Sequence, residues 1–172
     1  MMSQVVQEAI NEQIHAELSA SYSYLAMSAY CDHHNFTGAA KWLRVQSQEE
    51  YAHAMKLYDF LLARHARVAL AAPKAPRNDF GSIVEVFEAA YAQEQDVTSS
   101  INRIYDLAFK EKAFDAVVML EWFVNEQVEE EKTAREIVAR LNMVKDDPAS
   151  LLDIDRELGT RTPDEAATEG GE

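Results

Sequence analysis

The scarcity of helix-breaking residues constrains this chain more than any other feature. The 172 residues include only 5 glycines and 4 prolines, and these cluster at a few positions. In the first segment Val6, Ile10, Ile14, Leu18 and Leu25 recur at helical spacing and are predicted to share one buried stripe. The whole pattern predicts four long helices, over residues 3–33, 39–65, 82–110 and 113–142.

Residues typical of helix ends support this division. Ser82 is a predicted N-cap, and Glu85 follows it by three residues, as in a capping box. Near the C-terminus, Asp147 followed by Pro148 predicts the start of a short fifth helix, and Gly159 predicts its end.

The connections predict how the helices are arranged. Short breaks near residues 36 and 112 make antiparallel hairpins of the first and last pairs. The connection over residues 66–81 reaches about 53 Å at about 3.3 Å per extended residue. A helix of about 28 residues is about 42 Å long. This connection can therefore run the length of the bundle and make the second and third helices parallel.

The predicted fold is all-α: a four-helix bundle with a long crossover between helices two and three and a short C-terminal fifth helix. It forms one domain over residues 1–159. Residues 160–172 are polar, and we expect them to form a mobile tail.

Charge and residue usage exclude several classes of function. A net charge of −14 disfavours binding to nucleic acid, which requires basic surfaces. The chain has no run of about 18 apolar residues, so no membrane span is predicted. The N-terminus lacks the regions of a signal peptide, and Cys31 is the only cysteine. We therefore expect a cytoplasmic protein without an internal disulfide.

Polar residues interrupt the apolar stripe of every long helix near its middle. In a left-handed bundle the buried stripe repeats every seven residues. The polar residues on these lines are Glu17 and Tyr24 in the first helix, Gln46, Glu50 and His53 in the second, Glu94 in the third, and Gln127 and Glu130 in the fourth.

Inward-facing carboxylates require compensation. A buried carboxylate must be protonated, paired or bound to a metal, and no lysine or arginine falls on these lines. Taken singly, each Glu or His is more simply interpreted as wrongly assigned to the buried line, or as buried with a hydrogen-bond partner. Tyr24 is more simply interpreted as a packing residue. Four carboxylates and His53 at matching depth instead favour bound cations. An oxygen-rich set with one imidazole is typical of iron or manganese, and a bridging carboxylate would allow two metals to share it.

The set resembles the ferroxidase centre of the bacterial non-haem ferritins. The stretches MSAYCDHHNFTGAAKWLR and NEQVEEEK are also similar, and the similarity extends to about residue 159. It rests on Glu17, the Glu50-x-x-His53 pair, Glu94 and the Gln127-x-x-Glu130 pair.

The resemblance implies a role for each of these residues. Glu17, Glu50 and His53 would hold a first iron, with Glu50 bridging. Glu94 and Glu130 would complete the second.

The resemblance also implies roles for residues around the two irons. Gln127 would lie just outside the ligands, and Tyr24 beside the first iron as a hydrogen-bond donor and electron donor. A third iron site of some bacterial members is matched by Glu49, Glu126 and Glu129 together with Glu130.

The activity implied is iron storage. Ferritins assemble as shells of 24 subunits, oxidise Fe(II) with dioxygen or hydrogen peroxide, and store Fe(III) as an oxyhydroxide mineral. We therefore expect a homo-oligomeric ferroxidase. Bacterioferritins ligate haem through a Met at the position of Tyr51, so no haem is expected.

Two alternatives stay open at this point. One is a ferritin-like di-iron oxidase or peroxidase without mineral storage, although such enzymes typically carry a second Glu-x-x-His where this chain has Gln127-x-x-Glu130. The other is a non-catalytic shell whose carboxylates bind metal loosely.

Overall fold

The computed structural model describes residues 2–163 and contains five helices in this part of the chain. Their bounds lie within about two residues of the predicted ones. They are α1 (Gln4–His33), α2 (Thr37–Ala63), α3 (Ile83–Lys110), α4 (Phe114–Val144) and α5 (Pro148–Leu158). Of the predicted tail, residues 164–172 lie outside the described residues.

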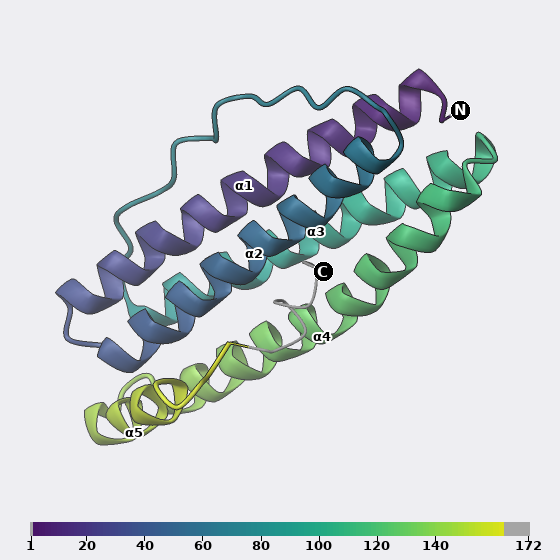
Figure 1. Ribbon diagram of the computed structural model, residues 1–172. Helices are drawn as coiled ribbons and strands as arrows, with labels where there is room; N and C mark the ends of the chain where they lie inside the picture. The colour runs from purple at the N-terminus through teal and green to yellow at the C-terminus, as the bar shows by residue number, and fades with distance from the viewer. Residues whose placement is uncertain (1, 164–172) are drawn as a thin grey trace.

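The four long helices form the predicted bundle (Figure 1). α1 and α2 make one antiparallel hairpin and α3 and α4 make the other, while the crossover runs back along the bundle so that α2 and α3 are parallel. Asn11 fastens the crossover to α1, because its side chain donates to the Arg67 carbonyl (3.0 Å) and accepts from the Ala69 amide (2.7 Å). None of the helices within residues 2–163 combines the length and apolar character needed to cross a bilayer.

Local signals at the helix ends explain where the elements stop. The Ser82 hydroxyl accepts from the Glu85 amide (3.1 Å), as the capping box predicts. Three helices are followed, two residues after their last residue, by a residue with positive φ. The amide of the next residue then donates to a carbonyl of the last helical turn and closes it. The residues with positive φ are Asn35, His65 and Lys112.

The core consists of two apolar clusters separated along the bundle axis by a polar layer. The first cluster surrounds Ile14, Leu57 and Phe123, and the second surrounds Leu43 and Phe87. Each long helix contributes to both clusters and passes through the polar layer between them. The layer therefore lies at one depth in all four helices and is sealed on both sides.

The prediction that Leu25 faces the core was wrong. Leu25 is 43% exposed, whereas Tyr24 beside it is buried. The seven-residue line Ile10, Glu17, Tyr24 and Cys31 stays buried along the whole of α1, and Leu25 stands one residue, about 100° of helix rotation, beyond that line. Cys31 is fully buried, and burial raises the pKa of its thiol to about 12.

The short helix α5 is attached to the start of α2 by a buried carboxylate. Asp155 is 5% exposed and accepts hydrogen bonds from the backbone amides of Gly38 (3.2 Å) and Ala39 (2.7 Å). Amides in the first turn of a helix have no partner within the helix, so Asp155 caps α2 from the other end of the chain. Arg140 on α4 pairs with Glu157 and holds α5 from its other side.

Candidate metal centre

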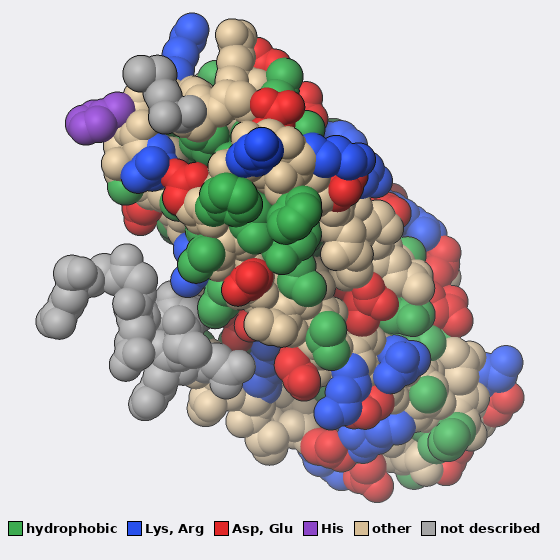
Figure 2. Space-filling model, turned by 90° about the vertical axis from the view of Figure 1, so that its right-hand side faces the viewer, with side chains coloured by type: hydrophobic (Ala, Val, Ile, Leu, Met, Phe, Trp, Pro, Cys, Tyr) green, Lys and Arg blue, Asp and Glu red, His purple; other side chains and the backbone are tan. Residues whose placement is uncertain are grey.

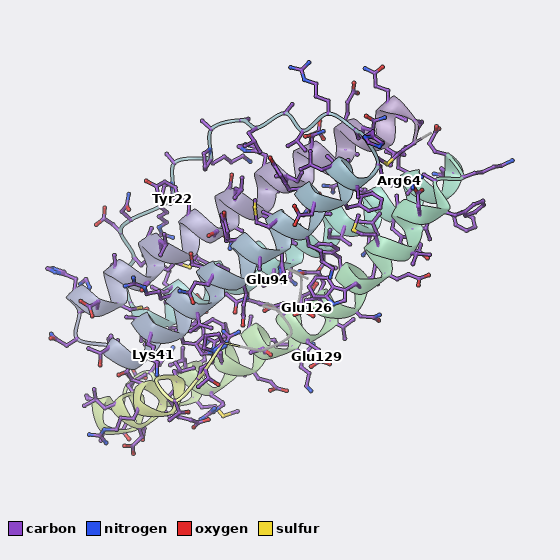
Figure 3. The ribbon with its side chains drawn as sticks, in the orientation of Figure 1. Tyr22, Lys41, Arg64, Glu94, Glu126 and Glu129 are labelled. Carbon is purple, nitrogen blue, oxygen red and sulfur yellow. The ribbon has the colours of Figure 1, made fainter. Side chains whose placement is uncertain are left out.

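The polar layer brings together the carboxylates that the seven-residue spacing predicted to face inward. Glu17, Glu50 and Glu94 are at most 1% exposed, His53 4% and Glu130 8%. They come from four different helices, and Glu94 lies near the middle of the bundle's length (Figure 3). Since no single helix carries the set, it exists only in the folded bundle.

Glu17, Glu50 and His53 form one compact group. One ligand atom from each lies within 4.8 Å of the others, which is suitable for a shared metal ion. Gln13 donates to Glu17 Oε1 (2.8 Å) and is itself held by the Ser100 hydroxyl (2.6 Å). Glu17 Oε2 and Glu50 Oε2 are buried without a hydrogen-bond partner among the described residues. Each carboxylate is therefore oriented, and each keeps one oxygen for a ligand.

Glu94 is held from two directions. The Tyr24 hydroxyl donates a short hydrogen bond to Glu94 Oε1, and Gln127 Nε2 donates to Glu94 Oε2 (3.2 Å). Burial, together with the charge of Glu94, raises the pKa of Tyr24 well above that of a free tyrosine. Tyr24 therefore stays protonated and serves as a donor at neutral pH.

Glu130 is linked to α2 through an amide. Gln46 Nε2 donates to Glu130 Oε2 (2.8 Å) and to Glu50 Oε1 (3.3 Å). A second group of potential ligands consists of His53, Glu126 and Glu130, again within 4.8 Å of one another. His53 thus belongs to both groups and lies between them.

The carboxyl groups of the layer are strongly perturbed. Burial raises the pKa of Glu17 and of Glu50 well above the usual glutamate value, and neighbouring carboxylates add to the shift. Burial also raises the pKa of Glu94, against the hydrogen bonds from Tyr24 and Gln127. Burial and the charge of Glu94 raise the pKa of Glu130 to about 8. The layer therefore lacks positive charge, which either protons or metal ions can supply.

The three additional residues of the predicted third site are placed differently from one another. Glu126 is half-buried beside His53 and Glu130. Glu49 is buried, and one of its oxygens accepts a short bond from Arg161. Glu129 lies about one turn along α4 from Glu126 (Figure 3), where it is exposed and 3.9 Å from Lys132. The structure brings Glu126 to the centre and leaves Glu129 outside it.

Sequence reasoning gave no role to three residues that contact the centre, although it placed one of them, Gln46, on the buried line of His53. Gln13 and Gln46 stand four residues before Glu17 and Glu50, a helical spacing that could have identified them as side-chain partners. Arg161 donates to Gln46 Oε1 (2.7 Å) from beyond α5, and no local pattern indicates it.

Comparison with known proteins agrees with the geometry. A family model described as a ferritin-like domain matches residues 7–144. The chain is 38% identical to the bacterial non-heme ferritin of Staphylococcus saprophyticus over 166 residues, which cover 96% of this chain and 99% of that protein. Its counterpart in Staphylococcus aureus strain MRSA252 is also 38% identical, over 165 residues.

Solved structures of ferritins share the fold of this chain. The open-pore ferritin of the archaeon Archaeoglobus fulgidus superposes with a TM-score of 0.93 at 41% identity, covering 94% of this chain and all of that one. Fold, sequence and the buried carboxylate–histidine layer therefore agree, and the chain belongs to the ferritin family as an iron-storage protein with ferroxidase activity.

Proposed function

We propose that the polar layer binds two Fe(II) ions side by side as substrate and positions them for oxidation. Glu17, Glu50 and His53 hold the first iron, Glu50 bridges to the second, and Glu94 and Glu130 complete the second. The observation that carries this assignment is the pair of buried oxygens, Glu17 Oε2 and Glu50 Oε2, that have no hydrogen-bond partner among the described residues and lie beside His53.

The surrounding donors keep the carboxylates in place before iron arrives. Gln13 orients Glu17, Gln46 orients Glu130, and Tyr24 with Gln127 orients Glu94. Preorganised ligands reduce the cost of arranging the site at the moment of reaction. Each Fe(II) gives up one electron and becomes Fe(III). The two electrons, with two protons from the solvent, reduce one dioxygen to hydrogen peroxide, or one hydrogen peroxide to two waters.

A third cation position beside the centre is also part of the proposal. Glu126 supports it, because it already lies with His53 and Glu130. Glu49 and Glu129 would complete the position, and Glu129 would have to turn inward from Lys132 to do so.

The chain is proposed to assemble into a shell of 24 copies around the stored mineral. Large apolar side chains lie at its surface, including Tyr22 (50% exposed), Leu70 (63%), Phe109 (60%) and Val118 (67%). Figure 2 shows hydrophobic side chains gathered among charged ones on one face. Such a surface favours contact between copies.

Sizing combined with iron loading tests the function as a whole. We expect a particle of about 470 kDa, the mass of 24 chains of 19.4 kDa. After aerobic addition of Fe(II), iron should co-elute with that particle in large excess over two ions per chain. A small oligomer that oxidises Fe(II) but releases the product would instead support the oxidase without storage.

Cation binding is expected to release protons. Because burial and the charge of Glu94 raise the pKa of Glu130 to about 8, this carboxyl largely retains its proton at pH 7. A cation displaces this proton, so titration with Mn²⁺ at pH 7 should release about one proton per chain. The number should fall as the pH rises past 8. Calorimetry in buffers of different ionisation enthalpy measures it, and binding without proton release at pH 7 would contradict the ligand assignment.

A further inference from the structure

Arg161 extends toward the centre from outside the four long helices. Its guanidinium donates to Gln46 Oε1 (2.7 Å) and to Glu49 Oε2. The central guanidinium carbon, Cζ, lies 4.4 Å from the centre of the Trp42 ring. The side chain is only 20% exposed and that of Glu49 is 8% exposed. Hydrogen bonds and ring stacking together make this a built contact, unlike an exposed ion pair.

The backbone that carries Arg161 is fixed to the end of α5. Its amide donates to the Leu158 carbonyl (3.2 Å), and Lys41 on α2 donates to the Gly159 carbonyl (2.8 Å). Arg161 itself belongs to no helix. The side chain can therefore leave Glu49 by rotation without moving α2 or α5.

The side-chain amide of Gln46 links Arg161 to Glu130, a proposed ligand of the second iron. Gln46 accepts from Arg161 through Oε1 and donates through Nε2 to Glu130. The carboxylate that Arg161 neutralises, Glu49, directly precedes the bridging Glu50 in the chain. A nearly buried carboxylate needs a positive partner, and the Arg161 guanidinium is such a partner for Glu49.

We propose that Arg161 competes with a metal cation for Glu49 and so controls when a third cation binds beside the di-iron centre. This inference rests on the proposed function, because it assumes that the centre fills first. While Arg161 lies on Glu49, the third position lacks one of its carboxylates. When Arg161 turns away, its guanidinium no longer competes for Glu49 and the third cation is held more tightly.

Mn²⁺ binding to the assembled protein tests the competition. The six-line electron paramagnetic resonance signal of free Mn²⁺ reports how many ions are bound per chain and how tightly. In the unchanged protein we expect a tight class at the centre and a weaker class at the third position. Arg161→Gln should tighten the weaker class about tenfold, within the range typical of coupled sites, and leave the number of tightly bound ions unchanged. Arg161→Lys keeps the charge and should restore the weaker binding.

Two further variants separate competition from loosening of α5. Arg140→Gln removes the α4 to α5 ion pair with Glu157 but does not touch Glu49, so it should leave the weaker class unchanged. In a Glu49→Gln background the weaker class should be lost, and adding Arg161→Gln should change nothing.

The inference is overturned if Arg161→Gln leaves the weaker class as it was, if Arg140→Gln tightens it equally, or if the tightening persists without Glu49. In each of these cases the proposed function would still hold if the unchanged protein binds the tight class of Mn²⁺ ions at the centre. Absence of the tight class in the unchanged protein would instead contradict the di-iron assignment itself.

Discussion

Replacing Glu50 or His53 by alanine is expected to slow the initial oxidation of Fe(II) about 100-fold or more, while the shell still assembles. Both side chains belong to the compact group with Glu17, and Glu50 is the proposed bridge between the two irons. Losing a residue that only orients a metal ligand typically costs 10–100-fold, so losing a ligand costs at least as much, and losing the bridge affects both positions at once. Stopped-flow absorbance after mixing with two Fe(II) per chain measures the initial rate.

Two comparisons make this result specific. Glu50→Gln keeps the shape of the side chain and removes its charge, so it should be as slow as the alanine variant. Glu136→Ala removes an exposed carboxylate from α4 away from the layer and should oxidise Fe(II) at the normal rate. Normal initial rates in both Glu50 variants would refute the assignment of the bridge.

Replacing Gly38 by alanine is expected to detach α5 from the bundle. A Cβ at Gly38 would overlap the backbone carbonyl oxygen of Asp155 and lie 2.6 Å from its carbon and 3.0 Å from the Gly159 nitrogen. All three are backbone atoms, so α5 itself must move. The movement breaks the two hydrogen bonds that Asp155 accepts from the start of α2. We expect a loss of about 3 kcal/mol, or a melting temperature lower by about 6–12 °C.

Gly81→Ala is the matched control for this substitution. A Cβ at Gly81 meets only the end of the flexible Glu85 side chain, at 2.9 Å, so the melting temperature should hardly change. Limited digestion with trypsin adds a local measurement, because cleavage after Arg156 and Arg161 should accelerate in the Gly38 variant alone. Equal melting temperatures for the two variants would show that Asp155 does not anchor α5.

The seven-residue spacing was sufficient to predict which polar residues face inward, because the period of a left-handed bundle determines the buried line. Glu17, Glu50, Glu94 and Glu130 all lie buried in one layer for that reason. The prediction failed for Leu25 because this residue directly follows Tyr24, whose seven-residue line fills the core, and therefore stands at the edge of the buried stripe.

The surroundings of the layer could be predicted only in part. Gln13 and Gln46 follow from their spacing before Glu17 and Glu50. The contact between Arg161 and Glu49 spans 112 residues and depends on where Asp155 places α5. Nothing local to Arg161 encodes that position, so only the folded chain shows it.

The central claim is that the buried carboxylates are compensated by iron. Anomalous diffraction at the iron edge, from crystals soaked anaerobically in ferrous salt, tests it most directly. The account predicts two peaks per chain about 3.5–4 Å apart, with Glu50 between them, Glu17 and His53 on one side and Glu94 and Glu130 on the other. Crystals that take up iron elsewhere, with no anomalous peak inside this layer, would contradict it.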